Sequence, residues 1–320
     1  ASSDGNWNYD KIYTHIQDAI KDADIKMIDQ ETVFTTDHDS VSSYPSFATP
    51  TEVGDAIIKA GFNVVESANN HIDDFGEGFL TDTLNFWKTK YPDVTLLGIH
   101  DSQEDADTVK IREVNGIKIA FLDYTYGTNG ISLPENKQWC VNMMDKDKIT
   151  SDVNAAKQNA DVVIVLPHWG TENSTAVSEY QKEYVNLFSE LGVDIVIGTH
   201  PHVLQPVEWV TNEQTGKKML VYYSIGNFIS HQTSLKQLCG GMAEIEIEKK
   251  SDEITITSAK LAPVVSWYKK TSGQKYEFAV YKLADYTESL GSSHAQDGAT
   301  PEYFTDYAKE IIPEEFLDLN

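Results

Sequence analysis

The 320-residue sequence contains only two cysteines, Cys140 and Cys239, and their spacing does not match a zinc site built from clustered thiolates. The two could form one disulfide, remain free thiols, or be unrelated. Long apolar runs are missing as well, and no stretch approaches the length of a membrane-spanning helix. The sequence also lacks internal repeats, low-complexity tracts and a clear linker, which excludes a repeat architecture.

Basic residues are half as frequent as acidic ones, with 25 Lys and Arg against 50 Asp and Glu and a formal net charge of −25. The electrostatic field of such a negatively charged protein repels nucleic acid and anionic membranes, so we expect no nucleic-acid partner. An anionic substrate would have to be held by local cations, either bound metal or a few of the lysines. The apolar share of 40% is typical of an ordinary globular protein.

The beginning of the sequence lacks an initiator Met and a signal-like apolar segment. We therefore expect a processed or trimmed form of a longer protein. A composition rich in Asp, Asn, Thr and Tyr but poor in cysteine is typical of bacterial envelope and secreted proteins.

Two histidines follow an apolar, strand-like run in the second half of the chain. The run 193–197 breaks at Gly198, and His200 and His202 follow on either side of a proline. A buried strand that ends in this way places imidazoles at the rim of a sheet, where α/β folds keep their chemistry. The spacing suits ligands of one metal ion or of two adjacent ions. Alone, the pattern could equally be a loop with two solvated histidines.

The same pattern occurs twice more. The run 161–166 is followed by His168, and the run 62–66 is followed by Asn70 and His71. Imidazole is the commonest metal ligand among side chains, and an amide oxygen suits harder divalent ions. Three runs that each end on such residues predict a metal site at the ends of the strands.

Carboxylates follow another short predicted strand. The run 25–28 is followed by two carboxylates, Asp29 and Glu31, which are catalytic or metal-binding candidates, although a lone acidic pair is usually a solvated turn. Glu31 could bridge two ions roughly 3.5–4 Å apart, the arrangement that clamps both oxygens of an in-line phosphoryl displacement. A divalent ion can activate water for that displacement, and His71 could protonate the leaving oxygen. Asp73 or Asp74 could orient the His71 ring.

The donor set as a whole combines carboxylate, amide and imidazole groups. This mixture suits a divalent ion such as Mn, Fe or Zn better than the thiolate sites of structural zinc. Asn70 could instead stabilise its own turn through its side chain. We interpret Glu172 and Asn227 as residues that support the ligands or their turns rather than as ligands.

The order of predicted elements indicates a mixed α/β fold. Strands and helices alternate in the middle of the chain, and the last third is mostly hairpins. Asn115-Gly116 is a strong hairpin signal. We expect two sheets packed face to face with helices outside in one domain, residues 1–285, and a peripheral helical tail at 286–320.

Four motifs together resemble a known family. They are Asn69-Asn70-His71-x-x-Asp74-x-Gly76, His168-Trp169-Gly170-x-Glu172, Gly198-x-His200-Pro201-His202 and Ser224-x-Gly226-Asn227-Phe228. In this order they resemble the bacterial capsule synthesis proteins of the poly-gamma-glutamate (CapA-like) type, within the calcineurin-like metallophosphoesterase superfamily. The resemblance runs from about residue 24 to about residue 283.

The resemblance implies a four-layer αββα sandwich with two divalent metal ions at the strand ends. It assigns Asn70, His168 and His200 to one ion and His202 to the other, with Glu31 as the bridge. It makes His71 the proton donor, with Asp74 as its catalytic partner. The residues that would support the ligands or the substrate are Asn69, Glu172 and Asn227.

One part of the family pattern is missing. The superfamily opens with a strand that ends in an Asp-bearing motif, and no apolar strand before Glu31 ends that way. Either this strand precedes Ala1, or the protein has only half of the metal site. We favour the first alternative, because the missing strand would be central to the sheet, and the resemblance also implies a membrane tether before Ala1.

Three functions remain open at this stage. The first is a metal-dependent phosphoesterase on the extracellular face of the bacterial cell envelope. The second is a non-catalytic surface component that binds or exports an anionic capsule polymer such as polyglutamate. The third is a metal-dependent hydrolase of the gamma-glutamyl amide bond. The expected partner is therefore an anionic phosphoester or polymer, and the sequence leaves the oligomeric state open.

Overall fold

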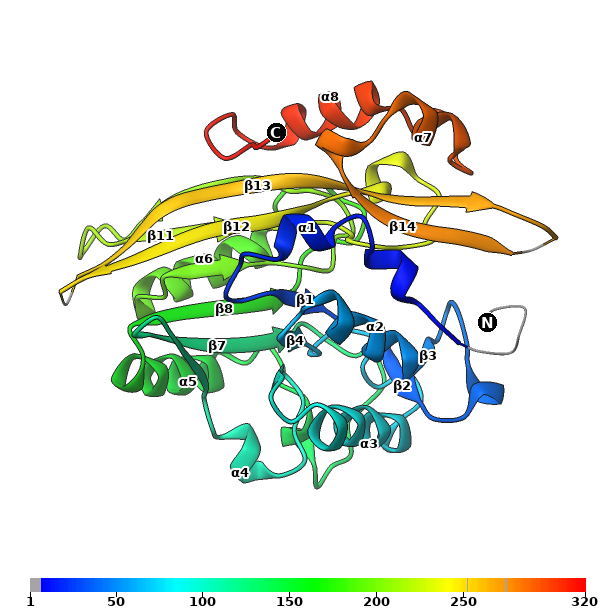
Figure 1. Cartoon of the computed structure of the whole chain (residues 1–320). Helices are drawn as coiled ribbons and strands as arrows, with labels where there is room; N and C mark the ends of the chain where they lie inside the picture. Colours follow the sequence, from blue (N-terminus) through cyan, green and yellow to red (C-terminus); the bar gives the residue numbers. More distant parts are fainter. Residues whose placement is uncertain (1–6, 252, 274) are drawn as a thin grey trace. The chain divides into compact units, whose positions relative to one another are not determined.

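The computed structural model describes residues 7–251, 253–273 and 275–320, which form two compact units. Unit 1 comprises residues 7–10 and Asp22–His168, and unit 2 comprises Lys11–Lys21 and Trp169–Asn320. Both units combine sheets with helices (Figure 1), which confirms the mixed α/β class. Within the described residues, no helix is both long and apolar enough to cross a membrane.

The first sheet of unit 1 consists of three short parallel strands in the order β1–β4–β5. Their bounds are β1 (Met27–Asp29), β4 (Val64–Glu66) and β5 (Thr95–Leu97). All three residues of β4 are buried, as expected for a parallel strand that is covered on both faces. Asp29 is paired with Glu66 in the ladder, so two carboxylates meet at the carboxyl edge of this sheet.

A second group of strands in unit 1 is built on β7 (Ile117–Thr125). It pairs with β6 (Lys110–Val114) in an antiparallel hairpin and with β8 (Val162–His168) in parallel. The hairpin turn contains Asn115 and Gly116, both with positive φ, which confirms the predicted hairpin. A separate parallel pair joins β2 (Val33–Thr35) to β3 (Ala48–Pro50).

Helices cover these strands. Asp145 caps the start of α5 (Lys146–Asn159), and Ile149, Val153 and Ala156 form its buried face against β7 and β8 (Figure 1). The remaining helices and helical turns of unit 1 are η2 (His38–Ser40), α2 (Glu52–Ala60), α3 (Glu77–Asn85), η3 (Phe86–Lys90), α4 (Gln103–Ala106) and η4 (Gln138–Cys140).

Asp105 of α4 forms ion pairs with Lys88 and Lys110. We expect these pairs to stabilise the folded protein less at acid pH. The pKa of Asp105 lies well below its usual range because His100, Lys110 and Lys88 face its carboxylate and outweigh its burial. The pKa of an Asp side chain is about 3.9 in the unfolded protein. A carboxyl group whose pKa is lower in the folded protein contributes to stability at pH values above about 3.9, and this contribution is lost as the pH falls from there through the folded pKa. We expect Asp105→Asn to lower the free energy of unfolding by about 1–3 kcal/mol at pH 7.

Urea unfolding of both proteins at pH 7 and pH 3 tests this expectation. The difference between the Asp105→Asn variant and the parent should shrink at pH 3, and an equal difference at both pH values would contradict the assignment.

Unit 2 contains a small mixed sheet with β11 (Lys218–Tyr222) at its centre. This strand is antiparallel to β10 (Val207–Thr211) and parallel to β9 (Ile195–Ile197). The neighbouring helix α6 (Glu179–Leu191) begins at a capping box of Ser178 and Gln181 and ends at a glycine with positive φ.

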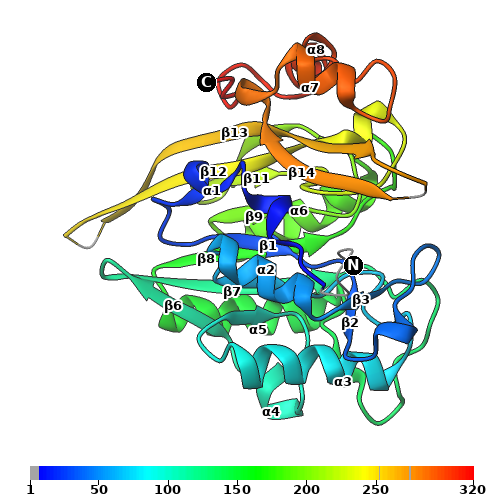
Figure 2. The same cartoon turned by 45° about the vertical axis from the view of Figure 1, so that its right-hand side comes forward.

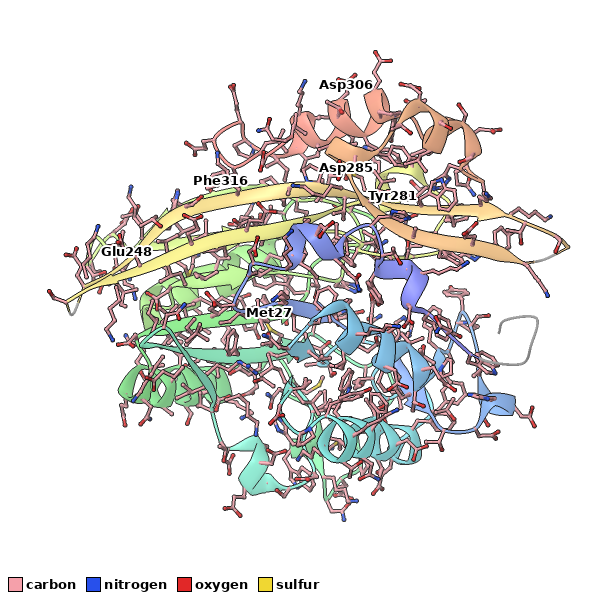
Figure 3. The ribbon with its side chains drawn as sticks, viewed as in Figure 1. Met27, Glu248, Tyr281, Asp285, Asp306 and Phe316 are labelled. Atoms are coloured by element: carbon pink, nitrogen blue, oxygen red, sulfur yellow. The ribbon has the colours of Figure 1, made fainter. Side chains whose placement is uncertain are left out.

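A second sheet in unit 2 is antiparallel and much longer. It consists of β12 (Cys239–Lys250), β13 (Glu253–Lys270) and β14 (Tyr276–Lys282), in that order. Glu248 lies near the turn between β12 and β13 (Figure 3), where the side chains of β12 alternate between half-buried and exposed. Helices α7 (Glu288–Ser293) and α8 (Pro301–Ile311) lie beside the β13–β14 part of this sheet (Figure 2).

The segment Lys11–Lys21 belongs to unit 2 although it lies between two parts of unit 1 in the sequence. It contains most of the turn η1 (Asp10–Tyr13) and the short helix α1 (Gln17–Ile20). Tyr13 and Ile16 are buried, and the Tyr13 ring lies 6.3 Å from that of Phe228. The helical turns η5 (Leu235–Leu238) and η6 (Leu283–Asp285) complete the unit. Cys140 and Cys239 are both buried free thiols.

Candidate functional site

The predicted site residues of unit 1 lie at the carboxyl ends of three strands. Glu31 comes two residues after β1, and His168 is the last residue of β8. The turn that carries Asn70 and His71 follows β4. Because β1 and β4 are parallel, the chain leaves both strands at the same edge.

Three potential ligand atoms converge at this edge. The Nε2 atom of His168 lies 2.9 Å from Oδ1 of Asn70 and 3.7 Å from Oε1 of Glu31. His168 is 1% exposed and Asn70 is 6% exposed, so both are held by their surroundings. An imidazole nitrogen, an amide oxygen and a carboxylate oxygen form a donor set that fits a divalent metal ion.

Asp29 lies on the other side of the His168 ring. Its Oδ2 atom is 3.3 Å from Nδ1 of His168. A histidine that binds metal through one nitrogen commonly donates the other N–H to a carboxylate, which orients the ring. The sequence marked Asp29, together with Glu31, as a carboxylate at the end of a strand, and the contact with His168 gives Asp29 a specific place at the site.

Asn69 braces the turn that follows β4. It is fully buried, its Nδ2 donates to the backbone oxygen of Gln30 at 3.0 Å, and its Oδ1 accepts from the backbone N–H of His71 at 3.1 Å. These two bonds tie the turn to the segment after β1. The positions of Asn70 and His71 relative to Glu31 therefore depend on Asn69.

His71 forms a close pair with Asp74. The distance from Nδ1 of His71 to Oδ2 of Asp74 is 2.7 Å, and the same oxygen accepts the backbone N–H of Phe47 at 2.8 Å. We assign the proton on Nδ1 to the bond with Asp74, which fixes the orientation of the His71 ring. Of the two aspartates that the sequence offered for this role, Asp73 and Asp74, the structure brings Asp74 to the ring.

Two further carboxyl groups are buried near Asp29. Burial raises the pKa of Glu66 and of Asp123 well above the usual range, and the charge of Asp29 adds to both shifts. Oδ2 of Asp123 accepts the backbone N–H groups of Ser67 and Ala68, each at 3.0 Å, which opposes the rise for Asp123. A cation bound at this edge would lower both pKa values again, because it stabilises the charged carboxylates. Their sequence signal is weak: a single acidic residue within or at the end of an apolar strand.

The predicted site residues of unit 2 form a second group. His200 and His202 follow β9 and both have positive φ, at 91° and 59°, a conformation that residues other than glycine rarely adopt. The Nδ1 atom of His202 lies 2.9 Å from Oδ1 of Asn227, and its Nε2 atom lies 4.0 Å from Oε1 of Glu172. Asn227 also donates to the backbone oxygen of Gln237 at 2.9 Å. The structure thus brings Glu172 and Asn227 to His202.

Comparison with known proteins connects these residues to a family. The family model described as "Bacterial capsule synthesis protein PGA_cap" matches residues 1–232. The capsule biosynthesis protein CapA of Bacillus anthracis is 31% identical over 181 residues, which cover 55% of this chain and 42% of that protein. The PGA biosynthesis protein CapA of Bacillus subtilis (strain 168) is 29% identical over 210 residues, which cover 63% of this chain and 53% of that protein.

The chain thus spans about half the length of the curated relatives that it matches. Among solved structures, a putative 5'-nucleotidase from Staphylococcus aureus aligns with a TM-score of 0.46 and 19% identity. The alignment covers 69% of this chain and 41% of the nucleotidase.

Proposed function

Because the chain belongs to the bacterial capsule synthesis protein PGA_cap family, we propose that it is a metal-dependent phosphoesterase of the bacterial cell envelope. The observation that carries this proposal is the convergence of Nε2 of His168, Oδ1 of Asn70 and Oε1 of Glu31 beside the pair of His71 and Asp74. Metal ligands and a proton donor are the two components that hydrolysis of a phosphoester requires.

In the proposed reaction, the site residues of unit 1 have three roles: metal binding, orientation of a ligand and proton donation. His168, Asn70 and Glu31 would hold a divalent ion such as Mn, Fe or Zn, and Asp29 would orient the His168 ring. When bound, such an ion supplies Lewis acidity at the phosphoryl group and activates water. His71, oriented by Asp74, would protonate the leaving oxygen from Nε2.

The remaining parts of the proposal follow from the sequence motifs. We propose His200 and His202 as further ligands, which makes two divalent ions the expected number. The proposed substrate is an anionic phosphoester at the extracellular face of the envelope, since the family is named for capsule synthesis. Bound metal would attract such a substrate locally, although the net charge of −25 repels it at a distance.

Metal analysis combined with hydrolysis of bis(4-nitrophenyl) phosphate tests the proposal. We expect the protein to bind a transition metal in near-stoichiometric amount and to hydrolyse the ester after addition of Mn²⁺. His168→Ala should lose the metal and at least 99% of the activity, about the effect of losing a principal ligand. His38→Ala is a matched control, because His38 lies in unit 1 and pairs with Glu52 instead of the site residues.

Glu31→Gln is a milder second variant, since it keeps the shape of the side chain and removes its charge. We expect it to lower metal affinity about 10–100-fold without unfolding the protein. Metal binding without turnover of any phosphoester would overturn the phosphoesterase proposal. In that case, cleavage of a gamma-glutamyl peptide would favour the amide hydrolase, and binding of polyglutamate without cleavage would favour the non-catalytic component.

A further inference from the structure

A tight turn after β7 places one more side chain at the site. Residues 128–131 form a turn in which the backbone N–H of Ile131 donates to the oxygen of Thr128 at 2.9 Å. Its two central residues, Asn129 and Gly130, have φ values of 52° and 79°. Positive φ at both central positions is the mark of a type I′ turn, for which Asn-Gly is a preferred sequence.

The side chain of Asn129 binds the amide of Asn70. Oδ1 of Asn129 accepts a hydrogen bond from Nδ2 of Asn70 at 3.0 Å. The opposite end of the same amide, Oδ1 of Asn70, lies 2.9 Å from Nε2 of His168. The Asn70 amide is therefore held at both ends, with its NH₂ group toward Asn129 and its oxygen toward the ligand set.

This orientation matters because the two ends of an amide differ chemically. The oxygen has lone pairs that can bind a cation, whereas the NH₂ group offers only donors. Rotation of the Asn70 amide by half a turn would replace a ligand atom by a donor group. An acceptor that binds the NH₂ end disfavours this rotation.

Asn129 also touches the ring of His71. Its Nδ2 atom lies 3.2 Å from Nδ1 of His71, whereas Oδ2 of Asp74 lies 2.7 Å from the same nitrogen. The shorter contact with a carboxylate assigns the Nδ1 proton to Asp74, so the amide of Asn129 packs against the edge of the ring. One side chain thus contacts both the amide of Asn70 and the imidazole of His71.

We propose that Asn129 is a positioning residue that keeps the oxygen of Asn70 turned toward the metal ion. This inference rests on the proposed function, because it requires Asn70 to be a metal ligand. According to this inference, the turn of residues 128–131 contributes to metal affinity. Metal affinity can be measured without any substrate.

Two variants at this position separate the side chain from the backbone. Asn129→Gly removes the acceptor, and glycine adopts positive φ at little cost, so the turn is kept. Asn129→Asp retains an oxygen that can accept from Nδ2 of Asn70, and aspartate also tolerates this conformation. The matched control is Asn115→Gly, because Asn115 has the same φ of 52° in an Asn-Gly turn, that of the β6–β7 hairpin.

The measurement is the Mn²⁺ dissociation constant of metal-depleted protein, determined by competition with a chromophoric chelator. We expect Asn129→Gly to weaken binding by about 10–100-fold, the usual effect of losing a group that orients a ligand. Asn129→Asp should bind Mn²⁺ within about threefold of the parent or more tightly, since it restores the acceptor and adds a negative charge. Asn115→Gly should leave the dissociation constant unchanged.

The results also distinguish this inference from the proposed function. Equal Mn²⁺ affinity of Asn129→Gly and the parent would overturn the positioning role even if the parent hydrolyses phosphoesters. Weaker binding by Asn129→Gly, with an unchanged melting temperature of the metal-depleted protein, would support it even if no ester is cleaved. Absence of Mn²⁺ binding by the parent would overturn both.

Discussion

Replacement of His71 by alanine is expected to lower kcat for an alkyl phosphodiester by about 10²–10⁴-fold, the usual contribution of a general acid. The expectation follows from the pair of His71 and Asp74, whose 2.7 Å contact orients the ring for the proposed protonation of the leaving oxygen. An alkoxide is a poor leaving group, so its departure depends on protonation.

The leaving group supplies the internal control for this prediction. A 4-nitrophenolate leaves readily without a proton, and His71→Ala should therefore slow hydrolysis of a 4-nitrophenyl ester far less than that of an alkyl ester. Metal content should remain that of the parent because His71 is not a proposed ligand. An equal loss of activity on both esters would show that His71 acts in some way other than proton donation.

Replacement of Gly98 by alanine is expected to lower the free energy of unfolding by about 2–5 kcal/mol, through backbone strain and overpacking together. Gly98 follows β5 and has a φ of +79°. A Cβ atom at this position would lie 2.3 Å from Oδ2 of Asp123 and 2.6 Å from the backbone nitrogen of Ala68. Both groups are buried and joined by a hydrogen bond, so neither can move away without breaking it.

Gly116→Ala is the matched control for this second prediction. Gly116 has nearly the same φ, +78°, but among the described residues no atom beyond its two chain neighbours lies within 4 Å of the position that its Cβ would occupy. The free energy of unfolding of Gly116→Ala should therefore fall only by the cost of the backbone conformation, about 1–2 kcal/mol. Urea unfolding of the two variants gives the comparison, and a difference below about 0.5 kcal/mol would contradict the close packing around Gly98.

Much of the site was predictable from sequence because its signals are local. Each apolar run that leads to a histidine forms a buried strand with the histidine at its end or in the turn after it, as β8, whose last residue is His168, shows. The Asn115-Gly116 hairpin was predictable for a similar reason, since the turn conformation depends on two adjacent residues. The mixed α/β class follows from such local elements in order.

The contacts that the sequence did not predict depend on pairing between distant segments. Asp29 lies against His168 because unit 1 brings β1 and β8 to the same site, and no local pattern specifies that. Glu66 and Asp123 occupy apolar strands, where a carboxyl group has no regular spacing to mark it. Asn129 carries a clear turn signal, but only its contact with Asn70 relates that turn to the site.

The order of segments along the chain has a consequence for synthesis on the ribosome. The segment Lys11–Lys21 emerges before residues 22–168 of unit 1, yet the ring of Phe228, which lies near that of Tyr13, belongs to the part translated after His168. The ring of His15, which stacks on Tyr281 at 4.4 Å, cannot form this contact until residue 281 has been translated. Contacts of such long sequence separation slow folding, so this segment remains exposed while unit 1 is completed. A fragment that begins at Trp169 would lack this segment, and its final packing would need an 11–21 peptide supplied in trans.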